Sequence, residues 1–197
     1  MLNNPDRDKW DKHYQSCSIT DEKEFPIAAE VLLHNQHLLP ESGTALDLAC
    51  GLGANAICLA EQGLSTSAWD ISASALDQLS NQTKKLNIEI AIESRDVSTN
   101  PPEENSFDVI SVSRFLDRDL MPYIKNAVRE NGQIFYQTFT KEKVSENGPS
   151  NPEYLLDKNE LLNFFINWKI LFYREEGTTG DIKRGFRNQA MLIAQKQ

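Results

Sequence analysis

The chain has 197 residues, of which 40% are hydrophobic, and its formal net charge is -9. This length suits one domain with a substantial core, and the acidic balance argues against nucleic acid as a partner, which is bound through clustered lysine and arginine. No stretch approaches the roughly 18 apolar residues of a membrane span, the start lacks the apolar core of a signal peptide, and three cysteines form no metal-like or disulfide spacing, so we expect a cytoplasmic protein without membrane or metal.

Two helices are predicted before the first strand. Residues 6–16 place Trp10, His13 and Tyr14 at the i, i+3, i+4 spacing of one helical face. Residues 25–39 continue with a second helical pattern that Pro40 ends. We expect residues 1–40 to form a helical cap with Tyr14 as a lid residue; the alternative is that this aromatic face packs the helix onto the domain.

From residue 44 the chain alternates between strand and helix patterns. We predict strands over 44–49, 66–70, 88–93, 107–112 and 133–139, and helices over 54–62, 73–86 and 119–130. Such alternation favours parallel βαβ units with right-handed crossovers. A polar loop over 141–154 follows, then a helix over 157–165 and strands over 168–175 and 186–194.

The most informative segment is 45–56, which reads A-L-D-L-A-C-G-L-G-A-N-A. Asp47 lies inside the strand, and Gly51 and Gly53 form the turn into the next helix. Glycine lets a ligand approach bare backbone, and the start of a helix directs N–H groups toward it. A nicotinamide site would more often show three spaced glycines. An ordinary strand-to-helix turn is the alternative.

Two further acids follow the next two strands. Asp70 should end the second strand beside the glycine turn, where a carboxylate can accept both hydroxyls of a ribose. A helix-capping role is the alternative for Asp70, although Ser72 is available as the cap. Asp96 lies just past the third strand, next to Arg95.

The glycine turn and the three acids, at βαβαβ spacing, resemble the class I S-adenosylmethionine-dependent methyltransferases. The resemblance implies a Rossmann-like α/β fold: a mostly parallel seven-stranded sheet with an antiparallel C-terminal hairpin and helices on both faces. It implies a single methyltransferase domain over 1–197, with a cap (1–40), a cofactor-binding core (44–139) and a C-terminal helix and hairpin (140–197). It also implies S-adenosylmethionine as cofactor and S-adenosylhomocysteine as product.

The resemblance also assigns roles to the cofactor-site residues. Asp47 would fix the turn or meet the cofactor's amino group, and the backbone of Ala49, Gly51 and Gly53 would meet the methionine part. Asp70 would bind the ribose.

The adenine would contact residues after the second and third strands. Ile71 would pack one adenine face, unless it is plain core. Asp96 would accept the exocyclic amine beside the backbone N–H of Val97, unless Arg95 holds Asp96 in a surface ion pair.

The segment after the fourth strand is expected to line the acceptor pocket, because ligands gather at the carboxyl ends of parallel strands. Ser113, bordering the cofactor, and Arg114 are candidates there. Arg114 and Arg118 could share a helical face toward an anionic substrate. The alternative is that they only balance Asp117 and Asp119.

The runs S-V-S-R-F-L-D-R-D-L and Q-T-F-T look like a bacterial group of small methyltransferases labelled tellurite-resistance-like. Where that group commonly has histidine, proline and glutamate, this chain has Asp117, Asp119 and Gln137, so a histidine base is missing here. The segment Asn100-Pro101-Pro102 resembles a base-modifying motif, but Glu103 replaces the stacking aromatic. We interpret it as a turn.

The sequence therefore predicts methyl transfer to a small molecule, with a thiol, selenium or tellurium compound, or a carboxylate as acceptor. In-line displacement from a sulfonium needs alignment and desolvation more than a base. One alternative is a non-catalytic S-adenosylmethionine-binding regulatory or partner protein, and another is a nicotinamide-dependent oxidoreductase. We expect a monomer or homodimer.

Overall fold

The computed structural model describes residues 5–16 and 26–197; the predicted start of the second helix at residue 25 lies outside them. The chain divides into two compact units, Met1–Pro101 and Pro102–Gln197, which are described separately. The strand order is β3-β2-β1-β4-β5-β7-β6 in a seven-stranded sheet. This confirms the predicted fold class.

The strands of the first unit are parallel. They are β1 (Thr44–Leu48), β2 (Ser65–Asp70) and β3 (Ala91–Ser94), with Asp70 of β2 opposite Ser94 of β3. The predicted early start of the third strand at residue 88 is wrong. Ile88 and Ile90 pack against the apolar cluster of this unit before the chain begins to pair with β2.

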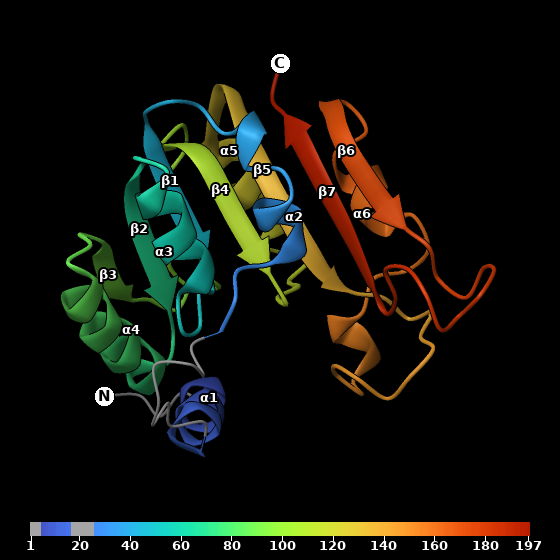
Figure 1. Cartoon of the computed structure of the whole chain (residues 1–197), viewed down its shortest axis with the longest axis horizontal. Helices are drawn as coiled ribbons and strands as arrows, with labels where there is room; N and C mark the ends of the chain where they lie inside the picture. Colours follow the sequence, from blue (N-terminus) through green and yellow to red (C-terminus); the bar gives the residue numbers. More distant parts are fainter. Residues whose placement is uncertain (1–4, 17–25) are drawn as a thin grey trace. The chain divides into compact units, whose positions relative to one another are not determined.

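Helices α3 (Ala54–Glu61) and α4 (Ala73–Leu86) cover one face of these strands (Figure 1). Side chains from both helices and from β2 form the apolar cluster, including Ile57, Ala68 and Leu79. The predicted cap of α4 is confirmed, because the Ser72 hydroxyl accepts a hydrogen bond from the Ala75 N–H.

The predicted helix over residues 6–16 is confirmed as α1 (Pro5–Ser16), which lies beyond the carboxyl ends of β1 and β2 (Figure 1). The single predicted helix over 25–39 is wrong. The chain instead forms α2 (Glu30–Leu33) and a 3-10 turn, η2 (Gln36–Leu38). Asn35 separates them: its backbone leaves the helical region at φ -129°, and its amide donates to the Val31 carbonyl over 2.9 Å.

The second unit contains the other four strands. β4 (Phe107–Ser113) runs parallel to β5 (Val128–Phe139). β7 (Gln189–Gln195) is antiparallel to β5 and to β6 (Lys169–Glu175). The predicted antiparallel C-terminal hairpin is therefore confirmed.

The helices of this unit are shorter than predicted. α5 (Met121–Ala127) packs on β5, and α6 (Glu160–Phe164) packs on β7. The predicted loop over 141–154 contains a 3-10 turn at its end, η3 (Pro152–Tyr154). The helix predicted from residue 119 begins later because the Asp117 carboxylate first closes a turn by accepting the N–H groups of Asp119 and Leu120.

Candidate functional site

The turn after β1 has an unusual backbone. The φ angle is positive at every second residue, 54° at Ala49, 53° at Gly51 and 75° at Gly53. This conformation costs a non-glycine residue such as Ala49 roughly 1–2 kcal/mol. The turn therefore has a tightly bent backbone at the carboxyl end of β1.

The buried side chain of Asp47 holds this turn in place through two hydrogen bonds. Its side chain is 1% exposed, and its two carboxylate oxygens accept hydrogen bonds from the Asn55 amide at 3.3 Å and the Ala56 N–H at 3.0 Å. Ala56 lies in the first turn of α3, whose N-cap, Gly53, has no side chain to do this. Burial raises the pKa of Asp47 to about 8, against the effect of these two hydrogen bonds, and the charge of Asp70 raises it further. This geometry supports the turn-fixing role, and the contact with a cofactor amino group stays a prediction.

Asp70 joins the same turn to α4. Its carboxylate oxygens accept the Gly51 N–H at 2.7 Å and the Ser72 N–H at 2.8 Å. Burial raises the pKa of Asp70, while the hydrogen bonds from Ser72 and Gly51 oppose that rise. A carboxylate oxygen has two lone pairs, so each oxygen retains capacity for a ligand hydroxyl. The Gly51 N–H is held by Asp70, and the Gly53 N–H donates to the Cys50 carbonyl.

Tyr14 lies directly on the turn. A Cβ added at Gly51 would lie 2.5 Å from the Tyr14 hydroxyl oxygen, so only glycine permits this approach. No described residue of α1 is buried. Hydrogen bonds hold the helix instead: Asp11 accepts the Ser72 hydroxyl at 2.6 Å and the Ser74 N–H at 3.1 Å, and the Gln78 amide donates to the Tyr14 carbonyl at 3.0 Å.

The predicted aromatic face of α1 is present. The Trp10 and Tyr14 rings stack with their centroids 6.1 Å apart, and the His13 ring meets the Tyr14 ring edge-on at 5.0 Å. Trp10 and His13 are exposed, and Tyr14 alone of the three is partly buried. The Tyr14 hydroxyl lies against Gly51, and the action of Tyr14 as a lid stays a prediction.

Asp96 lies beside Asp70 at the neighbouring strand end, since the Arg95 N–H donates to the Asp70 carbonyl at 2.8 Å. The Asp96 carboxylate accepts the Ser98 N–H at 3.1 Å and so closes its own turn. Ile71 is half-buried and directly follows the end of β2, and Val97 is buried three residues after the end of β3. The adenine-binding roles of these residues stay predictions.

The Arg95 side chain contacts the Trp69 ring, the backbone of Asn100 and Pro101, and Glu93. Its guanidinium stacks on the Trp69 ring, 3.9 Å from the centroid, donates to the carbonyls of Asn100 and Pro101 at 2.8 Å each, and forms its ion pair with Glu93. The predicted turn over Asn100-Pro101-Pro102 is wrong: the turn lies at residues 97–99, and only Asn100, a bend, adjoins it, while the two prolines are irregular chain. The stacking on Trp69 gave no local sequence signal, because Trp69 lies in β2 and Arg95 follows β3.

In the second unit, Ser113 ends β4 and the next residue, Arg114, has a φ of 55°. The Arg114 N–H donates to the Gln137 carbonyl at 2.8 Å, and the buried Tyr136 hydroxyl donates to the Phe115 carbonyl at 3.0 Å. Burial strongly raises the pKa of Tyr136. Tyr136 is therefore neutral and supports the segment after β4 through this hydrogen bond. The sequence analysis did not predict this role, and the only sequence feature that indicated it was a hydroxyl group within a buried strand.

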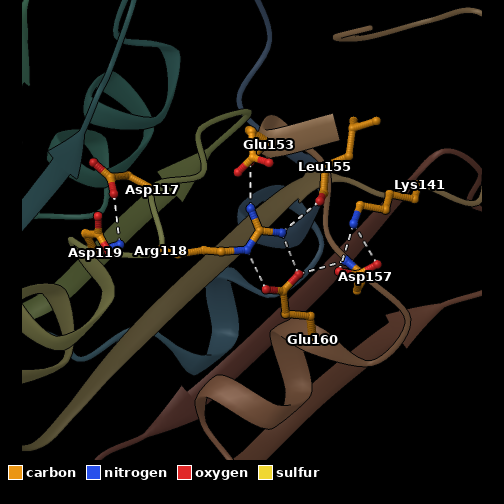
Figure 2. A network of polar contacts seen from close by, with 8 residues as sticks. All are labelled: Asp117, Arg118, Asp119, Lys141, Glu153, Leu155, Asp157 and Glu160. Carbon is orange, nitrogen blue, oxygen red and sulfur yellow. Dashed lines mark hydrogen bonds and ion pairs between the residues drawn. The ribbon is translucent and has the colours of Figure 1, made fainter. Parts of the chain in front are cut away.

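The predicted shared helical face of Arg114 and Arg118 is wrong, because the chain between them is not helical. Arg118 also does not balance a neighbouring aspartate. Figure 2 shows its guanidinium directed at Glu160, with contacts of 2.7 and 2.9 Å, and it also donates to the carbonyls of Glu153 at 2.7 Å and Leu155 at 3.0 Å. Its charge is satisfied within the protein.

Residues 5–16 and 26–197 contain no cluster of three or more histidine, cysteine, aspartate or glutamate side chains able to hold a metal. None of their helices is long and apolar enough for a membrane span.

Residues 45–132 match the family model described as a methyltransferase domain. The match begins within β1 and includes all three acids, Asp47, Asp70 and Asp96, and the segment after β4. The matched residues are slightly under half of the chain, and over them the chain resembles a methyltransferase domain. A comparison with curated proteins gives no match.

Solved structures share the fold over nearly the whole chain. TehB from Haemophilus influenzae is 20% identical, with a TM-score of 0.70, over 95% of this chain and 67% of that chain. A protein described in the conversion of a disulfide bond into a thioacetal group during echinomycin biosynthesis is 19% identical, with a TM-score of 0.70, over 97% and 92%. A SAM dependent methyltransferase from Aquifex aeolicus is 14% identical, with a TM-score of 0.67, over 94% and 98%. At these identities the likeness shows the fold alone.

Proposed function

We propose that the chain transfers the methyl group of S-adenosylmethionine to a small-molecule acceptor by in-line displacement. One observation carries the proposal: the strand-end carboxylate of Asp70 accepts the Gly51 N–H in the turn after β1, and the Tyr14 hydroxyl lies against this glycine. When bound, S-adenosylmethionine supplies a methyl group activated by its positively charged sulfur.

The charges around the turn fit this cofactor. Asp47 and Asp70 are both buried, each has a raised pKa, and Asp70 acts on Asp47 as a like charge. A positive ligand group near two such carboxylates would stabilise their ionised forms. S-adenosylmethionine carries a sulfonium and an ammonium, whereas a nicotinamide dinucleotide would bring a negative pyrophosphate. The electrostatics therefore favour the methyl donor.

The remaining predicted contacts complete this assignment. Asp70 would accept the ribose hydroxyls through its remaining lone pairs, and Asp96 with the Val97 N–H would bind the adenine amine. Ile71 would cover one face of the adenine.

The segment after β4 supports an acceptor that needs no base. Tyr136 has a strongly raised pKa, Asp117 closes its own turn, and Arg118 is paired with Glu160. A thiol or a selenium or tellurium compound is a soft nucleophile, and a carboxylate is already ionised at neutral pH. We propose one of these as the acceptor.

Calorimetric titration with S-adenosylhomocysteine tests the cofactor site. We expect micromolar affinity for the wild-type chain and at least a tenfold loss in Asp70→Asn, which keeps one acceptor for the backbone amides but not the charge. Asp77→Asn, on the exposed side of α4, is the matched control and should bind normally. Undiminished binding by Asp70→Asn would sink the proposal.

A second candidate is binding of S-adenosylmethionine without methyl transfer. The [4+2]-cyclase SpnF shares the fold, with a TM-score of 0.64 and 15% identity over 84% of this chain and 78% of that chain, so the fold alone does not fix the reaction. Formation of S-adenosylhomocysteine with thiol, selenium, amine and carboxylate acceptors separates the two candidates. A greater thermal shift with NAD than with S-adenosylhomocysteine would instead favour an oxidoreductase.

We also propose that residues 1–197 act as one cytoplasmic domain, as a monomer or homodimer. Light scattering on the purified chain measures the oligomeric state.

A further inference from the structure

One polar network of the second unit lies outside the predicted cofactor residues. Arg118 follows β4, and its five-donor guanidinium contacts Glu160 through two nitrogens and the carbonyls of Glu153 and Leu155 through two more bonds. We call this network the Arg118 clamp (Figure 2). Bidentate pairing of arginine with a carboxylate fixes direction as well as distance.

The clamp holds a segment that is mostly exposed. Within residues 151–160 only Leu155 and Leu156 are buried. Leu156 bonds the end of β5, donating to the Phe139 carbonyl and accepting from the Lys141 N–H, both at 2.9 Å. Arg118 provides the connection from this segment to the chain that follows β4.

The residues that bond to Arg118 also take part in further polar contacts. Glu160 also accepts the Asp157 N–H at 2.7 Å, and Asp157 forms an ion pair with Lys141 at 2.8 Å. The Glu160 hydrogen bond is the largest cause that raises the pKa of Arg118. An isolated exposed ion pair contributes little to stability, but Arg118 makes four directed bonds to three residues of one segment, so its main effect is on the position of that segment.

We propose that Arg118 is a positioning residue for methyl transfer, which holds residues 151–160 against the segment that follows β4 and so shapes the acceptor side of the reaction. The inference rests on the proposed function, because the carboxyl ends of parallel strands are where this class of fold binds its ligands. Arg118 acts through the segment it holds and does not bind the acceptor itself.

The test compares Arg118→Ala, Arg118→Lys and Glu160→Gln with the control Arg129→Ala. Arg129 also pairs with a carboxylate in this unit, Asp108, at 2.8 Å with similar exposure. Three quantities are measured: the rate of tryptic cleavage after Lys158, the affinity for S-adenosylhomocysteine, and kcat and KM with sodium hydrosulfide as the acceptor probe.

We expect Arg118→Ala to be cleaved after Lys158 at least fivefold faster than the wild type and to raise the KM for hydrosulfide at least fivefold, with unchanged cofactor affinity. Arg118→Lys should give a smaller effect, since lysine keeps the positive charge but lacks the planar set of N–H donors that lets arginine bond a carboxylate through two nitrogens. A general loss of folded protein would lower apparent kcat and leave KM unchanged. Arg129→Ala should match the wild type.

Cleavage of Arg118→Ala at the wild-type rate would contradict the claim that Arg118 holds residues 151–160 in place. Faster cleavage with an unchanged KM would contradict the claim that this segment shapes the acceptor side of the reaction. If the wild type does not bind S-adenosylhomocysteine, the proposed function itself is contradicted. If the wild type binds cofactor but does not methylate hydrosulfide, the thiol acceptor is wrong, and the cleavage rate then decides the clamp.

Discussion

Replacement of Gly53 by alanine should destabilise the glycine turn through two separable effects. The first is backbone strain, because the φ of Gly53 is 75°, which costs an alanine roughly 1–2 kcal/mol. The second is a collision, because the new Cβ would lie 2.5 Å from both terminal methyl carbons of Leu79 in α4. Overpacking of this kind costs about 1–3 kcal/mol.

Gly180 separates the two effects. Its φ is 76°, and a Cβ added there meets nothing within 4 Å. Gly180→Ala therefore carries the same strain without the collision, and the change in unfolded-chain entropy is common to both variants. The difference between the two should be about 1–3 kcal/mol of unfolding free energy, the overpacking contribution alone.

Urea denaturation of both variants measures this difference, and thermal unfolding should show it as roughly 2–4 °C for each kcal/mol in a chain of this length. The double variant Gly53→Ala with Leu79→Ala should show a favourable coupling, since the smaller side chain makes room for the new Cβ. Equal destabilisation by Gly53→Ala and Gly180→Ala would refute the argument that close packing of α4 requires glycine at this position.

Three further predictions concern the supports of the site. The pKa of Asp47 is raised to about 8, so the folded chain binds more protons than the unfolded chain between about pH 4 and pH 8, and its stability should fall as pH rises through that window; Asp47→Asn should reduce this slope in urea denaturation, and an unchanged slope would contradict it. Tyr136→Phe should cost about 1–2 kcal/mol in the same assay, because the Phe115 carbonyl loses its donor; no loss would mean that solvent replaces the hydroxyl. Asp11→Ala should expose α1 to faster amide hydrogen exchange without a large change in global stability, because Asp11 holds that helix to Ser72; exchange at the wild-type rate would show that other contacts suffice.

Sequence reasoning succeeded best where a local pattern carried the information. The glycine turn, the strand-end position of Asp70 and the Ser72 cap depend on residues a few positions apart, and the structure places them as predicted. Helix lengths were less predictable. Asn35 and Asp117 shorten two predicted helices, because their side chains bond nearby backbone groups in competition with the helix.

The sequence by itself determined the order of strands and helices, the glycine turn and the acids that follow successive strands, because periodicity and turn chemistry are local properties. The tertiary structure alone decided which distant groups meet. It placed the Tyr14 hydroxyl on Gly51 and joined Arg118 to Glu160. Such pairs depend on where a strand ends and a loop returns, and a long polar side chain has several possible partners until the backbone fixes its position. The sequence therefore predicts the cofactor site from local patterns, whereas only folding selects the contacts between distant residues.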